Sequence, residues 1–152
     1  MSVPVVENIA ANILTAIDAI TTANSFNQDL NGFRPVRSDY SDVSPENGTV
    51  LIVQESAEPV DGAVNTREWN QRFWLQAIVK DSDSTTTAID TRINQVAGDI
   101  IKKLMEDHTR GGYAIDTAVA AVVPFNVEAF TGVAVGIDIR YRSDWDDPFT
   151  QA

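Results

Sequence analysis

The chain has 152 residues, 43% of them hydrophobic, which is enough for one domain with a real core and argues against disorder. It contains no cysteine, so disulfides, cysteine-ligated metals and a cysteine nucleophile are excluded. Its 22 acidic and 11 basic residues give a net charge of −11, which disfavours nucleic-acid binding through a basic patch, because such a chain repels phosphates.

An apolar stripe predicts that the chain begins with a long helix over residues 3–24. Ser2 is suited to cap this helix and Pro4 to its first turn. No basic segment precedes an apolar run here, so we expect no secretory signal. The stripe consists of Val6, Ile9, Ile13, Ile17 and Ile20.

Alternating and β-branched runs predict four strands and leave open a short fifth one at 33–37. In chain order the ranges are 33–37, 50–56, 66–80, 114–123 and 133–142. Pro35 restricts the first to a short edge strand, because proline cannot donate to a ladder. The run over 114–123 is continuously apolar and predicts a buried strand that Pro124 ends. The longest apolar stretch, 118–125, is too short to span a bilayer.

A second long helix is predicted over residues 85–107, with its capping residues in 81–84. Asp99 and Lys103 are spaced to form an ion pair on its surface. Gly111-Gly112 is expected to stop it, because glycine accepts the left-handed conformation found past helix ends.

The order of these elements predicts an α+β fold. We expect a mixed, mostly antiparallel sheet of four to five strands with both long helices packed on one face. Residues 1–142 form the single domain, and residues 143–152 are a polar C-terminal tail that is mobile in the isolated subunit.

A search for chemistry yields no catalytic constellation. His108 is the only histidine, and beside Glu106 and Asp107 at a helix end it is better explained as a complement to the helix dipole. The acidic clusters 81–83 and 144–147 lack the full ligand set of a calcium loop. Nucleotide-binding and serine-hydrolase motifs are absent. We therefore predict a protein that is not an enzyme and that uses no cofactor or metal.

Exposed features favour subunit contacts instead. Arg140 and Arg142 on the last predicted strand suit directed pairs with carboxylates. The sequence leaves open whether those acids belong to a neighbouring subunit, for example in the acidic stretch 38–66, or to the same one. The candidate interface residues are Arg110, Arg140, Arg142, Trp74, Phe130 and Phe149. Trp69 and Phe125 are further candidate apolar anchors. For each of these aromatic residues the sequence leaves open, and slightly favours, burial in the core of its own subunit.

Four segments of the chain resemble the tail-terminator, or tail-completion, proteins of long-tailed bacteriophages. They are the first helix from Val6-Glu7-Asn8-Ile9-Ala10 onward, the strand Gln71-Arg72-Phe73-Trp74-Leu75, the helix end Thr109-Arg110-Gly111-Gly112, and the ending Ile139-Arg140-Tyr141-Arg142-Ser143-Asp144 with Asp147-Pro148-Phe149. The resemblance covers nearly the whole chain through short motifs, of which the ending is the most specific.

The resemblance implies a structural virion protein. Such proteins assemble as a closed ring, usually of six subunits, on the head-proximal end of the tail tube. The ring ends tube growth, joins the neck proteins of the head, and lets DNA pass without specific binding. The excess of acidic residues in this chain suits the central channel of such a ring, because a basic ring would hold the DNA. The expected partners are further copies, the tail tube protein and neck proteins, with no membrane. We further expect the loops 38–48 and 57–66 and the tail from Ser143 to order only on assembly.

Three other functions remain open from the sequence. The nearest is a head–tail connector, a stopper or another minor tail protein of the same particle. A small-ligand-binding module, with a pocket between sheet and helices, belongs to a different class. An enzyme is the third. The subunit count and the type of tail do not follow from the sequence.

Overall fold

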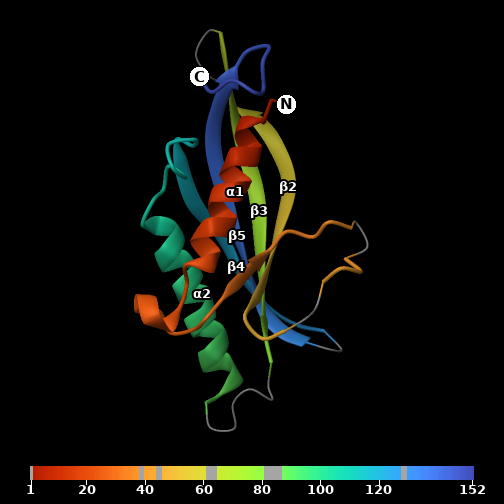
Figure 1. Cartoon of the computed structure of the whole chain (residues 1–152), viewed down its shortest axis with the longest axis vertical. Coiled ribbons are helices and arrows are strands. Elements are labelled where there is room, and N and C mark those ends of the chain that lie inside the picture. The colour runs from red at the N-terminus through yellow and green to blue at the C-terminus, as the bar shows by residue number, and fades with distance from the viewer. Residues whose placement is uncertain (1, 38–39, 44–45, 61–64, 81–86, 128–129) are drawn as a thin grey trace.

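A five-stranded sheet with both helices on one face forms the molecule, as the computed structural model in Figure 1 shows. The structure describes residues 2–37, 40–43, 46–60, 65–80, 87–127 and 130–152. Its elements are α1 (Val5–Asp18), a short 3-10 helix η1 (Thr22–Asn24), β1 (Asn31–Phe33), β2 (Thr49–Val60), β3 (Thr66–Val79), α2 (Ile89–Met105), β4 (Asp116–Val127) and β5 (Phe130–Asp144). The predicted α+β fold is confirmed.

The strands lie in the order β1-β2-β3-β5-β4. β1 runs parallel to β2, and all other neighbours are antiparallel. β1 covers only the first three residues of β2, from Thr49 to Leu51. The remainder of β2 has no neighbouring strand on that side among the described residues, so both β2 and β4 expose a sheet edge. The predicted strand at 33–37 in fact ends at Phe33, before Pro35.

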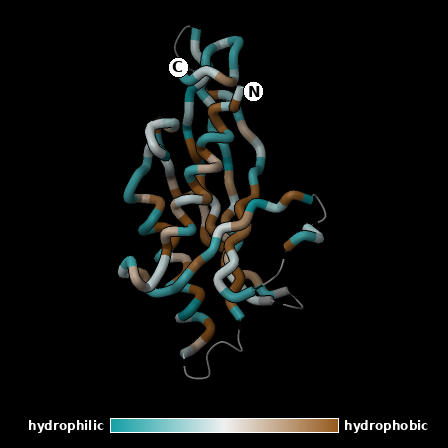
Figure 2. The backbone as a smooth tube through the Cα atoms, viewed as in Figure 1, coloured by the Kyte–Doolittle hydropathy of each residue, from teal (hydrophilic) through white to brown (hydrophobic). Residues whose placement is uncertain are grey.

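The core lies between the helices and the sheet. The side chains of Ile9, Ile13 and Ile17 are fully buried against the sheet, as the spacing of the stripe predicts. Phe73 and Ile137 extend this core from β3 and β5. Figure 2 shows hydrophobic segments gathered where the helices cross the sheet. Burying each such side chain contributes about 1.5–3 kcal/mol, which makes this face the main source of stability.

Both helices are shorter than predicted. α1 begins at Val5 with Pro4 as its N-cap, so the predicted capping by Ser2 is wrong. α2 begins after Ala88, which provides no side-chain cap, and the predicted caps in 81–84 lie outside the described residues. α2 ends at Met105, and Gly111 takes its left-handed φ in the turn that follows. Among the described residues, no helix combines the length and hydropathy that crossing a membrane requires.

The predicted ion pair between Asp99 and Lys103 is wrong. Asp99 is buried and accepts hydrogen bonds from the backbone N–H groups of Asn27 and Gln28, each at 2.9 Å. Lys103 instead pairs with Glu106 at 2.9 Å. Asp99 and Lys103 do lie one helical turn apart in α2, but Asp99 is on the face of α2 that binds the loop after α1.

A strand does form near the predicted range 114–123, but the predictions that it is buried and that it ends at Pro124 are wrong. β4 begins at Asp116 and is an edge strand in which Val119, Val122 and Val123 are exposed. Pro124 does not end it but pairs with Val133 inside the hairpin. Proline is compatible with this place, because an edge strand leaves one side of its backbone unpaired.

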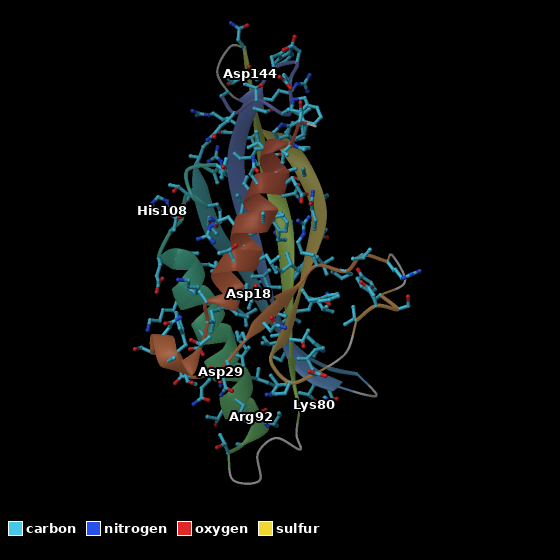
Figure 3. All side chains as sticks on the ribbon, viewed as in Figure 1. Asp18, Asp29, Lys80, Arg92, His108 and Asp144 are labelled. Carbon is cyan, nitrogen blue, oxygen red and sulfur yellow. The ribbon has the colours of Figure 1, made fainter. Side chains whose placement is uncertain are left out.

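The C-terminal tail folds back on the subunit, and its predicted mobility remains a prediction. The N–H of Val5 donates to the carbonyl of Pro148 at 3.1 Å, and the N–H of Asp144 donates to Thr150 at 2.9 Å. The Nε of Arg67 donates to the Trp145 carbonyl at 2.7 Å, with its guanidinium over the indole ring. The tail thus joins the end of the sheet to the start of α1. Asp144 lies at the end of the molecule where Figure 1 marks both chain ends (Figures 1 and 3).

Candidate functional site

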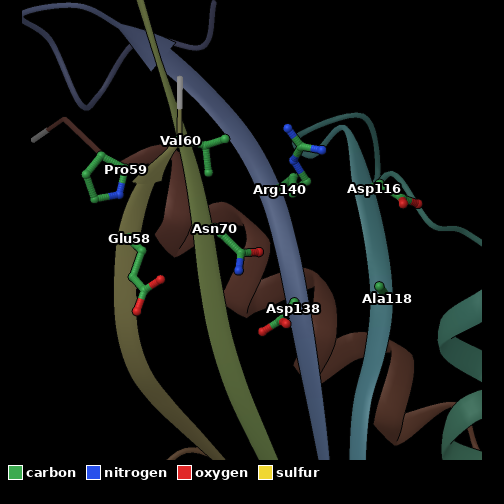
Figure 4. Close-up of a pocket in the computed structure, with 8 residues that line it drawn as sticks. All are labelled: Glu58, Pro59, Val60, Asn70, Asp116, Ala118, Asp138 and Arg140. Atoms are coloured by element: carbon green, nitrogen blue, oxygen red, sulfur yellow. The ribbon is translucent and has the colours of Figure 1, made fainter. Parts of the chain in front are cut away.

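The sheet face opposite the helices carries a group of charged side chains. Figure 4 shows Glu58, Asn70, Asp138 and Arg140 on this face, with α1 behind the sheet. No helix of the described chain covers it. Because directly opposite residues in antiparallel strands share a face, the register of β3 on β5 sets which of these groups meet.

Arg140 and Arg142 both bind one carboxylate of their own subunit. Arg140 Nη2 lies 2.6 Å from Glu68 Oε2, and Arg142 Nε lies 3.3 Å from Glu68 Oε1. The Glu68 side chain is 5% exposed, whereas those of Arg140 and Arg142 are 49% and 45% exposed. The sequence left open whether these arginines pair within the subunit or with a neighbouring one. In the structure they pair within the subunit, and about half of each arginine side chain remains exposed.

Trp74, a predicted interface anchor, is partly engaged within the subunit. Its indole N–H donates to Glu55, and its ring lies over Gly136 so closely that a Cβ there would be 2.9 Å from it. The neighbouring Arg72 forms a two-point ion pair with Asp138, which raises the pKa of Arg72. Gly136 on β5 is thus covered by Trp74 of the same subunit.

A shallow groove of about 400 Å³ crosses the upper part of this face (Figure 4). It is lined by Glu58, Pro59, Val60, Asn70, Asp116, Ala118, Asp138 and Arg140. Small-molecule sites are mostly apolar and enclose most of their ligand. The open groove offers charged side chains instead, and two of them are already bound to Arg72 and Glu68.

β4 presents an exposed apolar surface along one edge of the sheet. Val119, Val122 and Val123 are 39%, 45% and 47% exposed. Val119 and Val122 lie opposite Ile137 and Val135, on the helix side of the sheet, whereas Val123 lies opposite Ala134 on the other side. Asp116 is the only charged residue in the strand. A long edge that is apolar and uncharged beyond Asp116 is a template for pairing with another strand.

Arg110 does not fit its predicted interface role. It is 1% exposed, and its Nη2 donates to the carbonyl groups of Leu104 and Asp107 at the end of α2. Burial lowers the pKa of Arg110, partly offset by Asp107. Phe149 is 47% exposed and remains available. Phe130 begins β5, but its side chain lies outside the described ones.

His108 lies at the periphery, in the loop between α2 and β4 (Figure 3). Its Nδ1 is 3.4 Å from Asp116 Oδ1, and both side chains are more than half exposed. In the tail, Asp147 accepts hydrogen bonds from the hydroxyl of Thr150 and from the N–H of Phe149, which lower the pKa of Asp147. The described residues contain no group of three or more side chains placed to hold a metal ion.

Reasoning from the sequence missed the exposed edge of β4. A continuous apolar run is compatible with a buried strand or with an edge that another molecule covers. Pro124 was the available signal, because proline inside a strand indicates an edge.

No protein-family model matches the chain, and a search of curated proteins found no match. The resemblance to tail-terminator proteins therefore depends on the residues quoted for it.

Proposed function

We propose that this chain is a structural virion protein that caps the head-proximal end of a phage tail tube as a ring of identical subunits. The ring ends tube growth and forms the surface to which the head and neck attach. The resemblance in the sequence motivates the proposal. The exposed apolar edge of β4 is the structural observation that carries it.

An exposed apolar edge of this kind favours aggregation unless a partner covers it. The chain carries a net charge of −11, yet its outermost strand displays three exposed valines and a single acid. Natural proteins usually protect edge strands with lysine, proline or a covering loop, and over residues 117–123, before Pro124, β4 has neither lysine nor proline. A strand that stays apolar supports a role in subunit association, where a specific contact buries roughly 1,000 Å² or more.

The charge of the chain fits a passage for DNA. Eleven more acids than bases give each subunit a field that repels phosphates at moderate salt. A ring with such a lumen lets DNA slide, whereas a basic ring would retain it.

Disruption of the gene in the phage that encodes it tests the proposal. We expect tails of uncontrolled length, or tails that do not join filled heads, in electron micrographs. Supplying the wild-type chain from a plasmid restores normal particles, which is the control. Particles of normal tail length and normal infectivity without the gene would refute the proposal.

Labelling separates the terminator from its neighbours in the particle. A biotin-maleimide label on Ala11→Cys, an exposed position on α1, should be seen with gold-conjugated streptavidin at the head-proximal end of headless tails that were completed with the labelled chain. A label on heads without tails would instead favour the connector or stopper alternative.

A further inference from the structure

The two free edges of the sheet run in opposite directions. β2 is antiparallel to β3, β3 to β5, and β5 to β4. β4 is therefore antiparallel to β2, at the other side of the same sheet. If a second copy is placed beside the first with the same orientation, its β2 edge meets the β4 edge as an antiparallel pair. Such a head-to-tail contact is the type that closes rings.

We propose that β4 of one copy pairs with the free part of β2 of the next copy, residues 118–123 along residues 53–58, so that one sheet continues from subunit to subunit. This inference rests on the proposed ring function, because it specifies the contact that joins the ring. It identifies the partner of the apolar edge as the opposite edge of an identical chain.

The free part of β2 is suited to receive a strand. Residues 54–59 are all exposed, and no described strand pairs with them on the outer side. Pairing would give the unpaired backbone N–H and C=O groups of both edges their partners. It would also cover Val122 and Val123, which the isolated subunit leaves at 45% and 47% exposure.

Charge favours this pairing over one between two copies of the β2 edge. β2 carries Glu55 and Glu58 with no base, so two such edges would oppose acids to acids. In the proposed register Glu58 lies opposite Ala118 and Asp116 opposite Val60. The acids of one strand then face uncharged residues of the other.

Both edges carry a bulge, which restricts the partners they accept. The pairing of β2 with β3 shifts between Gln54 and Ala57, and that of β4 with β5 shifts between Val119 and Ala121. The Gln71 side chain donates to the Glu55 carbonyl at 2.7 Å and so holds the first bulge in place. Bulges twist an edge and oppose indiscriminate pairing, which suits a contact formed only in one geometry.

Cysteine cross-linking tests the pairing, because the native chain contains no cysteine. Phage carrying both Ala120→Cys and Ser56→Cys in this chain are oxidised, and their tails are run on a non-reducing gel. We expect a ladder of covalent multimers that ends at the size of the ring. Neither single variant should cross-link. The pair Val122→Cys with Gln54→Cys, joined by a flexible bismaleimide, gives an independent second test.

The matched control combines Ser56→Cys with Ala11→Cys, an exposed position on α1, and should give no ladder. A dimer from Ala120→Cys alone would show that β4 pairs with β4 and overturn the inference. Absence of any ladder from both pairs, in tails that contain the chain as a ring, would overturn it while leaving the proposed function intact. Absence of the chain from purified tails would overturn both.

Discussion

Glu68 and Arg140 join the two central strands across the uncovered face of the sheet, with Arg140 Nη2 2.6 Å from Glu68 Oε2. The carboxylate is almost completely buried, whereas the guanidinium is half exposed. Arg142 binds the second oxygen of the same carboxylate. A buried acid between two cations organises this end of the sheet within the subunit, and about half of each arginine side chain remains exposed.

Glu68→Gln should lower the free energy of unfolding by about 1–2 kcal/mol, because it removes the charge that both arginines bind. Urea denaturation at neutral pH measures the loss. Glu46→Gln, at an exposed glutamate in the loop before β2, is the matched control and should change stability by less than about 0.5 kcal/mol. Equal effects of the two substitutions would contradict a structural role for Glu68.

Asp99→Asn should destabilise the fold by about 2–3 kcal/mol. The buried carboxylate accepts hydrogen bonds from the backbone N–H groups of Asn27 and Gln28 and from the Asn27 side chain at 3.0 Å. An amide has one oxygen and turns its NH₂ group toward these donors. Equilibrium unfolding in urea gives the difference.

Asp18→Asn is the comparison for Asp99. Asp18 also accepts a backbone N–H bond, from Gly32 at 2.7 Å, but its side chain is exposed to water. We expect Asp18→Asn to lower the free energy of unfolding by less than half as much as Asp99→Asn does. A larger loss at Asp18 would show that burial is not what makes Asp99 important.

Stability should fall at acid pH partly through Asp107. The Thr109 hydroxyl, and then the Gly111 N–H, hold the pKa of Asp107 below its ordinary value. A carboxylate with a lowered folded-state pKa stabilises fully above the unfolded-state pKa of about 3.9, and this contribution disappears as the pH falls toward the folded-state pKa. The loss of unfolding free energy between pH 6 and pH 3 should therefore be smaller in Asp107→Asn than in the wild type.

Thr109→Val provides a second measurement of the same linkage. It removes the hydroxyl that contributes most to the lowered pKa of Asp107. Its pH dependence, from urea midpoints at each pH, should lie between that of the wild type and that of Asp107→Asn. An unchanged pH dependence in both variants would contradict this account.

Three glycines should respond to alanine in different ways. A Cβ on Gly132 would lie 1.9 Å from the Ala77 carbonyl oxygen, so Gly132→Ala should cost about 3 kcal/mol. At Gly136 the three atoms nearest to such a Cβ all belong to the ring of Trp74, a side chain that can shift, and the cost should be about 1 kcal/mol. At Gly98 in α2 nothing lies within 4 Å, so alanine should stabilise by about 0.5–1 kcal/mol. Thermal unfolding that gives a different order would be evidence against this packing.

Val122→Lys should abolish self-association while leaving the subunit folded. Val122 is 45% exposed on the β4 edge, so a lysine can reach water, and the unfolding free energy should change by less than about 0.5 kcal/mol. Light scattering after gel filtration reports the association. Ala11→Lys adds the same charge on α1 and should leave association unchanged. If both variants associate like the wild type, the β4 edge is not part of the contact.

The sequence by itself determined the elements whose burial follows a local period. The stripe through Ile9, Ile13 and Ile17 and the alternation around Phe73 correctly identified the faces that meet in the core. The reason is that the repeat of a helix or strand fixes which side chains share a face. From these faces and their order along the chain, the α+β class followed.

Only the tertiary structure decided which strand is outermost and which polar groups are buried. The apolar run of β4 has the same local pattern in the middle or at the edge of a sheet, and strand order depends on contacts between distant residues. For the same reason the partners of Asp99, the burial of Arg110 and the docking of the tail at Pro148 could not be derived from spacing. The candidate association surface arises from these non-local placements, because an edge exists only once the whole sheet has formed.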